Sequence, residues 1–172
     1  ELEKDLLRLQ TITERFSKVG SKPALTENNL YQTIAKTVNY LKTRSSDKVV
    51  FDIQVETKDI TAKYNAPLLE WVLENVCKNA MDAMNGEGTI ILKVNQYDKN
   101  ISIDIADNGK GIPKSRQKAI FKPGFTTKDR GWGLGLSLTK RIVEEYHKGK
   151  IFVAESEPGK GTTIRIILKD KV

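Results

Sequence analysis

Apolar residues recur at three- and four-residue intervals in four stretches of the chain, and this spacing predicts four helices. The first covers residues 1–19, where the intervals resemble a heptad seam, and residues 20–23, with Gly and Pro, end it. The second begins at residues 26–29, which carry capping side chains. The third begins near Pro67 and the fourth covers residues 134–147. The apolar positions of the first three are Leu2, Leu6, Leu9 and Phe16; Leu30, Ile34, Val38 and Leu41; and Leu69, Val72, Leu73, Val76, Ala80 and Ala83.

Other segments alternate between apolar and polar residues, and these predict strands. Residues 98–100 are short enough to join two of them as an antiparallel hairpin. Residues 112–120 indicate a short helix, and residues 121–132 a loop. Mostly antiparallel strands with helices between them favour an α+β layer sandwich and disfavour a doubly wound sheet. The predicted strands are residues 49–55, 89–97, 101–106, 151–154 and 162–168.

The size of the chain suits one compact domain with an appendage, since 38% of its 172 residues are hydrophobic. We place the boundary between residues 1–22 and residues 23–172. No apolar run approaches the roughly 20 residues of a membrane span, so we expect a cytoplasmic domain without membrane insertion. The first residue is not Met, so we expect this chain to be a fragment of a longer parent protein. That parent could carry a membrane anchor. The single Cys77 excludes an internal disulfide and fits a reducing compartment.

Three glycine-rich segments, residues 107–111, 131–135 and 159–161, follow the third predicted helix. Glycine permits positive φ and close backbone approach, so such segments can turn main-chain N–H groups toward phosphates. Asp107 ends a predicted strand, where its carboxylate can accept a hydrogen bond from the amino group of adenine. Asn79 lies on the flank of the third helix, and its oxygen is a ligand type that Mg²⁺ takes together with phosphates. The combination predicts a nucleotide pocket.

Two common nucleotide-binding motifs do not account for this pattern. The chain has no G-x-x-x-x-G-K-[ST] segment, which excludes a P-loop. The glycines of residues 131–135 precede a helix but do not follow the first strand of a βαβ unit, as a dinucleotide fingerprint requires. An ATP pocket in this chain is therefore of another kind.

Five motifs in order carry a family resemblance. They are residues 74–82 (ENVCKNAMD), 107–111 (DNGKG), 121–128 (FKPGFTTK), 131–136 (GWGLGL) and 159–162 (GKGT). Together they resemble the catalytic ATP-binding domain of sensor histidine kinases, within the superfamily shared with gyrase, mismatch-repair ATPases and heat-shock chaperones. The resemblance covers about residues 25–170. It implies a Bergerat-type two-layer sandwich with a mixed, mostly antiparallel sheet and helices on one face.

The resemblance also implies roles for individual residues. Asp107 would recognise the adenine amino group, helped by Gly111 and Thr162, while Asn79 would bind Mg²⁺ with Asn75 beside it. Residues 121–133 would form a lid over the phosphates. The catalytic residues would be Asn75 and Lys128. The residues expected to bind ATP are Asn79, Asp107, Gly109, Gly111, Thr126, Thr127, Lys128, Gly131, Gly133, Leu134, Gly135, Leu136 and Thr162.

Position 82 departs from the family pattern, because many histidine kinases carry a basic residue three places after the Mg²⁺-binding Asn and this chain has Asp82. Lys78 and Lys128 are the alternatives for a cation at the γ-phosphate. In the ATPase branch, a Glu four residues before that Asn activates water, and here the position is Asn75, which is no general base. We therefore expect transfer to a protein histidine rather than rapid hydrolysis.

The expected acceptor is not in this chain. Its single histidine, His147, lies near the end of a predicted helix without an acceptor-type motif, so we expect a structural role. Residues 1–19 resemble the end of the second phosphoacceptor helix, which implies a homodimeric parent and a response-regulator receiver domain as partner. We expect this fragment to bind ATP without labelling itself.

Three other functions remain open on the sequence. A serine-directed kinase of the anti-sigma type shares the nucleotide motifs, but it usually has Glu at the position of Asn75. A non-catalytic interaction module would keep the fold as a scaffold. The net charge of +7 suits a nucleic-acid-binding module, but the lysines are dispersed, which favours a solvated surface without nucleic acid as partner.

Overall fold

The computed structural model describes residues 7, 10, 22–126, 133 and 135–170. Within them, a mixed sheet has the strand order β2-β4-β5-β7-β6. β2 runs parallel to β4, and the other neighbouring pairs are antiparallel. The sheet consists of β2 (Val49–Gln54), β4 (Gly88–Tyr97), β5 (Asn100–Asp107), β6 (Lys150–Glu157) and β7 (Gly161–Lys169).

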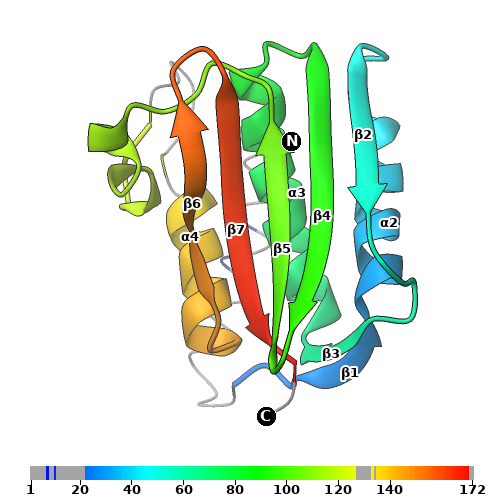
Figure 1. Ribbon diagram of the computed structural model, residues 1–172. Coiled ribbons are helices and arrows are strands. Elements are labelled where there is room, and N and C mark those ends of the chain that lie inside the picture. The colour runs from blue at the N-terminus through cyan, green and yellow to red at the C-terminus, as the bar shows by residue number, and fades with distance from the viewer. Residues whose placement is uncertain (1–6, 8–9, 11–21, 127–132, 134, 171–172) are drawn as a thin grey trace.

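Helices cover one face of this sheet, as Figure 1 shows. They are α2 (Leu30–Lys42), α3 (Ala66–Ala83) and α4 (Gly135–Arg141). α3 lies behind the middle of the sheet, between α2 and α4 (Figure 1). The α+β sandwich with a mostly antiparallel sheet and helices on one face is thereby confirmed.

The core lies between the sheet and α3, because both elements turn their apolar periodicity toward the same interface. Alternate residues of the central strands point inward, and α3 supplies an apolar stripe at helical spacing. All of these side chains are buried: Ile90, Leu92 and Val94 of β4; Ile101, Ile103 and Ile105 of β5; Ile164, Ile166 and Leu168 of β7; and Leu69, Val72, Leu73 and Val76 of α3.

The prediction that a helix begins at residues 26–29 was wrong. Thr26–Asn29 form β1, which pairs antiparallel with β3 (Thr61–Tyr64). Asn29 then caps α2, since its Oδ1 accepts a hydrogen bond from the Gln32 N–H at 2.9 Å. The capping residue was in the expected segment, but the strand pairing that holds the preceding residues involves a partner more than 30 residues away in sequence.

Residues 112–120 do not form one short helix. They contain two 3₁₀ turns, η1 (Lys114–Arg116) and η2 (Ala119–Phe121), the second of which extends one residue past the predicted end. Residues 135–146 are helical as predicted, but the second part, η3 (Ile142–Tyr146), is π-helical. The segment with the two 3₁₀ turns lies against α4 through η2 and against β6 through hydrogen bonds of Ile112 and Gln117 with Ser156.

His147 is buried where η3 ends. Its Nδ1 donates to the Ile142 carbonyl at 2.8 Å, and its Nε2 accepts from the Asn65 N–H at 3.1 Å. Burial lowers the pKa of this imidazole, against the smaller opposite effect of the two hydrogen bonds. The ring therefore joins η3 to the residue that caps α3, in line with the structural role expected for it.

Most of the predicted leader helix, residues 1–19, lies outside the described residues, as do residues 127–132 of the predicted lid. Among the residues that the structure describes, none of the helices has the length and hydrophobicity needed to cross a membrane.

Candidate functional site

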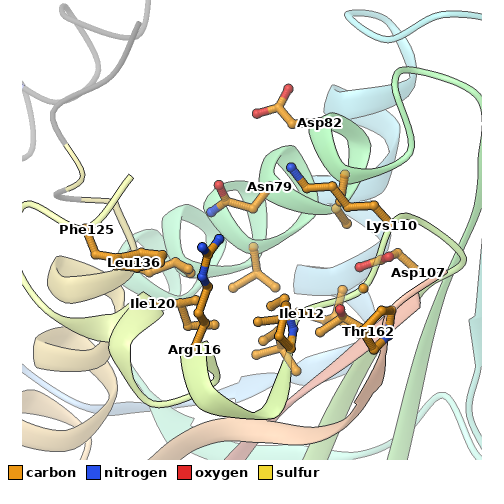
Figure 2. Close-up of a pocket in the computed structure, with 18 residues that line it drawn as sticks. Asn79, Asp82, Asp107, Lys110, Ile112, Arg116, Ile120, Phe125, Leu136 and Thr162 are labelled. Carbon is orange, nitrogen blue, oxygen red and sulfur yellow. The ribbon is translucent and has the colours of Figure 1, made fainter. Parts of the chain in front are cut away.

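A cavity of about 450 Å³ opens between α3, the end of β5, the η1–η2 segment and the start of α4. Figure 2 shows the residues that line it. Five of the predicted binding residues line it together although they come from different parts of the chain: Asn79, Asp107, Gly111, Leu136 and Thr162.

Asp107 lies at the floor of the cavity, at the end of β5 and directly opposite Thr162 of β7. Its Oδ1 accepts a hydrogen bond from the Gly109 N–H at 2.8 Å. Burial raises the pKa of this carboxyl, and hydrogen bonds from the backbone of Gly109 and Thr162 partly offset the effect. A half-buried acceptor at the end of an apolar cavity suits an exocyclic amino group, because that group supplies donors in return for lost hydration.

Thr162 is held in place by a residue that the sequence did not indicate. Its Oγ1 lies 2.7 Å from Ser156 Oγ, which also accepts the Ile112 N–H at 2.8 Å. The two hydroxyls and the Ile112 amide tie β6, β7 and the segment after Gly111 together. Ser156 is one of several hydroxyl residues in the chain, and only the register of β6 on β7 shows which of them meets Thr162.

The glycines after Asp107 allow close packing of backbone against backbone. A Cβ on Gly109 would lie 2.6 Å from the Ala83 carbonyl oxygen, and Gly111 has φ +72° and lies against the Glu157 carbonyl. Between them, the Lys110 N–H donates to Ala83 O at 2.9 Å, and Lys110 O accepts from the Gly159 N–H at 2.7 Å. Gly111 lines the cavity, whereas Gly109 is not among its lining residues. This turn is clamped between the end of α3 and the β6–β7 turn.

Asn79 and Asn75 occupy successive turns of α3 and have different surroundings. Asn79 lines the cavity, and its Nδ2 donates to the Asn75 carbonyl at 3.0 Å. The Asn75 side chain instead donates to Thr139 Oγ1 of α4 at 2.9 Å. Gly135 leaves room for this contact, since a Cβ there would lie 2.7 Å from Asn75 Oδ1. Asn75, predicted as catalytic, is not among the lining residues and joins α3 to α4.

The donor set fits a magnesium ion shared with a phosphate ligand. The hydrogen bond from Asn79 Nδ2 to the Asn75 carbonyl orients the side-chain amide. The amide oxygen of Asn79, a hard ligand, then points away from that carbonyl. Among the described residues, no group of three or more His, Cys, Asp or Glu side chains could hold a metal. Mg²⁺ rarely uses an all-protein cage and completes its shell with phosphates and water.

Several predicted residues fall near the cavity or outside the described part of the chain. Thr127, Lys128, Gly131 and Leu134 lie outside the described residues. Thr126, Gly133 and Gly135 are described but are not among the residues that line the cavity. Gly133 has φ +64°, and its carbonyl accepts the Gly124 N–H at 3.0 Å, which closes the base of the loop between them.

Sequence reasoning missed the apolar wall of the cavity and two of its cations. The wall includes Ile112, Ile120 and Phe125, and the cations are Lys110 and Arg116. The apolar residues could have been found, because they interrupt an otherwise basic segment. The cations could not, since several Lys and Arg residues occur in the same segment and only the fold distinguishes those that face the cavity.

Comparisons with known proteins identify the family of the chain. A sequence model of the histidine kinase-, DNA gyrase B- and HSP90-like ATPases matches residues 64–172. Nitrogen regulation protein NtrY of Azorhizobium caulinodans is 33% identical over 155 residues, which is 86% of this chain and 20% of NtrY. The signal transduction histidine-protein kinase AtoS of Escherichia coli is 49% identical over 102 residues, which is 59% of this chain and 16% of AtoS.

Solved structures show the same fold. The catalytic domain of histidine kinase ThkA superposes with a TM-score of 0.78 and 26% identity, over 86% of this chain and 96% of that domain. A ThkA structure in complex with the response regulator protein TrrA superposes with a TM-score of 0.75 and 24% identity, over 98% of this chain and 49% of that one.

An α+β sandwich with helices on one face of a mixed sheet is also the fold of the histidine kinase catalytic domain on which the chain superposes. The chain belongs to the family of histidine kinase-, DNA gyrase B- and HSP90-like ATPases, and as a member it binds ATP. Its named relatives include sensor histidine kinases. The chain spans only about a fifth of the length of NtrY and less of AtoS.

Proposed function

We propose that this domain delivers the γ-phosphoryl group of ATP to a histidine on a phosphoacceptor helix of its parent protein. The observation that carries the proposal is the cavity that joins a half-buried carboxylate, Asp107, to an Asn on α3, Asn79. Phosphoryl transfer depends on positioning and charge neutralisation rather than on covalent chemistry by the protein.

The base and the phosphates of the nucleotide would bind at opposite ends of the cavity. Asp107 would accept a hydrogen bond from the adenine amino group, with Gly111 and Thr162 beside it. Asn79 would hold Mg²⁺ through its side-chain oxygen, and the ion would neutralise charge on the phosphates. Residues of the lid and of the segment that follows it would surround the phosphates: Thr126, Thr127, Lys128, Gly131, Gly133, Leu134, Gly135 and Leu136.

Transfer rather than hydrolysis is supported by the surroundings of Asn75. An amide is no general base at neutral pH, and this amide is engaged with Thr139 of the neighbouring helix. A water molecule at the γ-phosphate therefore receives no activation from this position. We infer that ATP persists in the cavity until an acceptor histidine reaches it.

The partners follow from the same proposal. The parent's dimerisation helices would supply the acceptor, with residues 1–22 as the end of one such helix, and a receiver domain would take the phosphoryl group in turn. The ThkA–TrrA complex is one kinase of this fold with a response regulator bound.

The test mixes the purified domain with ATP labelled at the γ-position and a separately produced phosphoacceptor domain from the parent. We expect acid-labile label on the acceptor domain, none on His147, and slow release of inorganic phosphate. Label on serine would favour the anti-sigma type of kinase. Fast phosphate release without labelled protein would contradict the proposal, and ATP binding without either reaction would favour a non-catalytic module.

A further inference from the structure

The end of the cavity at Asn79 carries a carboxylate in addition to the negative charge that bound phosphates would bring. Asp82 lines the cavity one turn after Asn79 on α3. Residues three apart on a helix lie on the same side, so phosphates at Asn79 are close to this carboxylate. Among the described lining residues, the cations are Lys110 and Arg116.

Arg116 stands at the phosphate end of the cavity. Figure 2 shows its side chain rising from η1 toward the side on which Asn79 lies, away from Asp107. Lys110 leaves the chain three residues after Asp107, and in the same view its ammonium end also reaches toward Asn79. Both cations therefore extend toward the side on which phosphates would lie, and the chemistry of the side chain distinguishes them.

The backbone under Arg116 is firmly held. Its N–H donates to the Pro113 carbonyl at 2.8 Å. The next residue, Gln117, donates from Nε2 to Ile112 O at 3.1 Å and to Ser156 O at 3.3 Å. Ser156 belongs to β6 and also contacts Thr162. The backbone of Arg116 is thereby held relative to Thr162 at the floor of the cavity.

The chemistry of the guanidinium suits this position. It presents paired donors in a planar fork that matches two phosphate oxygens, and it keeps its charge throughout the physiological pH range. Lys114 and Lys118 carry the same charge on the same segment but are not among the residues that line the cavity. Position within the fold, rather than charge alone, distinguishes Arg116 from them.

We propose that Arg116 binds the terminal phosphates of ATP and selects ATP over ADP, in place of the basic residue that position 82 lacks. The inference rests on the proposed nucleotide site and assigns its phosphate end to a residue outside the five sequence motifs. Loss of a charge-assisted hydrogen-bonding partner weakens binding by roughly 10- to 100-fold.

The test measures dissociation constants of ATP, ADP and adenosine for wild type, Arg116→Ala and Arg116→Lys, in the presence of Mg²⁺. We expect Arg116→Ala to weaken the binding of ATP by roughly 10-fold or more. The binding of ADP should weaken less, and the binding of adenosine should not change. Arg116→Lys keeps the charge without the fork, so we expect an intermediate loss for ATP. Arg116 is exposed on a surface turn, and equal melting temperatures would confirm that each variant is folded.

The matched controls are Lys114→Ala and Lys118→Ala, which remove one charge from the same segment. If they weaken ATP binding as much as Arg116→Ala does, the effect comes from the overall positive charge of the segment and the inference is wrong. It is equally wrong if Arg116→Ala weakens ATP and adenosine alike, or leaves ATP unchanged. If wild type binds no ATP at all, the proposed function fails instead.

Discussion

The two ends of the cavity are built differently. At the floor, Asp107 and Thr162 face each other across paired strands, and Ser156 ties both to the next segment. At the phosphate end, Asn79 projects from α3 and Arg116 from a short 3₁₀ turn, with the base of the lid closed by Gly124 and Gly133. The end that we propose for the base is thus formed by the sheet, whereas the end that we propose for the phosphates depends on how turns and helices meet.

Asp107→Asn should produce the largest loss of binding and the clearest separation between function and stability. We expect ATP affinity to fall on the order of 100-fold, because an amide nitrogen facing the adenine amino group leaves a donor against a donor. Burial raises the pKa of Asp107, so its ionised form costs folding free energy at neutral pH and the variant should melt no lower than wild type. Calorimetric titration and thermal unfolding measure both effects. Unchanged ATP affinity would mean that adenine lies elsewhere.

Gly111→Ala should damage the floor through the backbone. The residue has φ +72° and lies against the Glu157 carbonyl, so we expect a loss of about 2 kcal/mol in the free energy of unfolding. Urea denaturation measures it. Gly159→Ala is the matched control, since φ is +82° but no atom lies within 4 Å of its Cβ, and it should cost about 1 kcal/mol. Equal losses would show that backbone conformation alone, without the contact, limits position 111.

Asn75→Ala tests the join between α3 and α4, which supports the phosphate end. Removing the hydrogen bond leaves the Thr139 hydroxyl buried without this partner, so we expect a loss of about 1 kcal/mol in stability. A double-mutant cycle with Thr139→Val isolates the pair. Adenosine affinity should remain unchanged, because Asn75 is not among the residues that line the cavity. A large loss of adenosine binding would contradict the division of the cavity into two ends.

The smallest expected effect is the pH dependence that His147 contributes. Its folded-state pKa lies below the unfolded value, so the unfolded chain binds the proton first as the pH falls. The stability that the neutral ring provides is complete above the ordinary histidine pKa of about 6.5. It is lost as the pH falls below that value through the folded-state pKa. Urea midpoints between pH 5 and pH 8 should show this decrease in wild type and a smaller one in His147→Gln; identical pH profiles would contradict it.

The sequence predicted the floor of the site better than its phosphate end. Asp107, Gly111 and Thr162 stand in motifs at strand ends, and strand pairing brings strand ends together, so their meeting in one cavity could be expected. Arg116 could not be distinguished from the neighbouring lysines, because its place depends on two 3₁₀ turns that have no periodic pattern.

Short elements and long-range pairs set the remaining limits of prediction. β1 and β3 have four residues each, too few to show alternation, and their pairing joins distant segments. The π-helical end of the last helix is followed by His147, whose hydrogen bond to Asn65 spans 82 positions in sequence. Such contacts are consequences of the assembled fold and have no local signature.

The most direct measurement is a crystal structure of the domain with Mg²⁺ and a non-hydrolysable ATP analogue. We expect the adenine amino group within hydrogen-bonding distance of the Asp107 carboxylate, the ion on Asn79 and the terminal phosphates at Arg116. A nucleotide bound outside the cavity, or in the cavity with its phosphates toward Asp107, would contradict the proposed site.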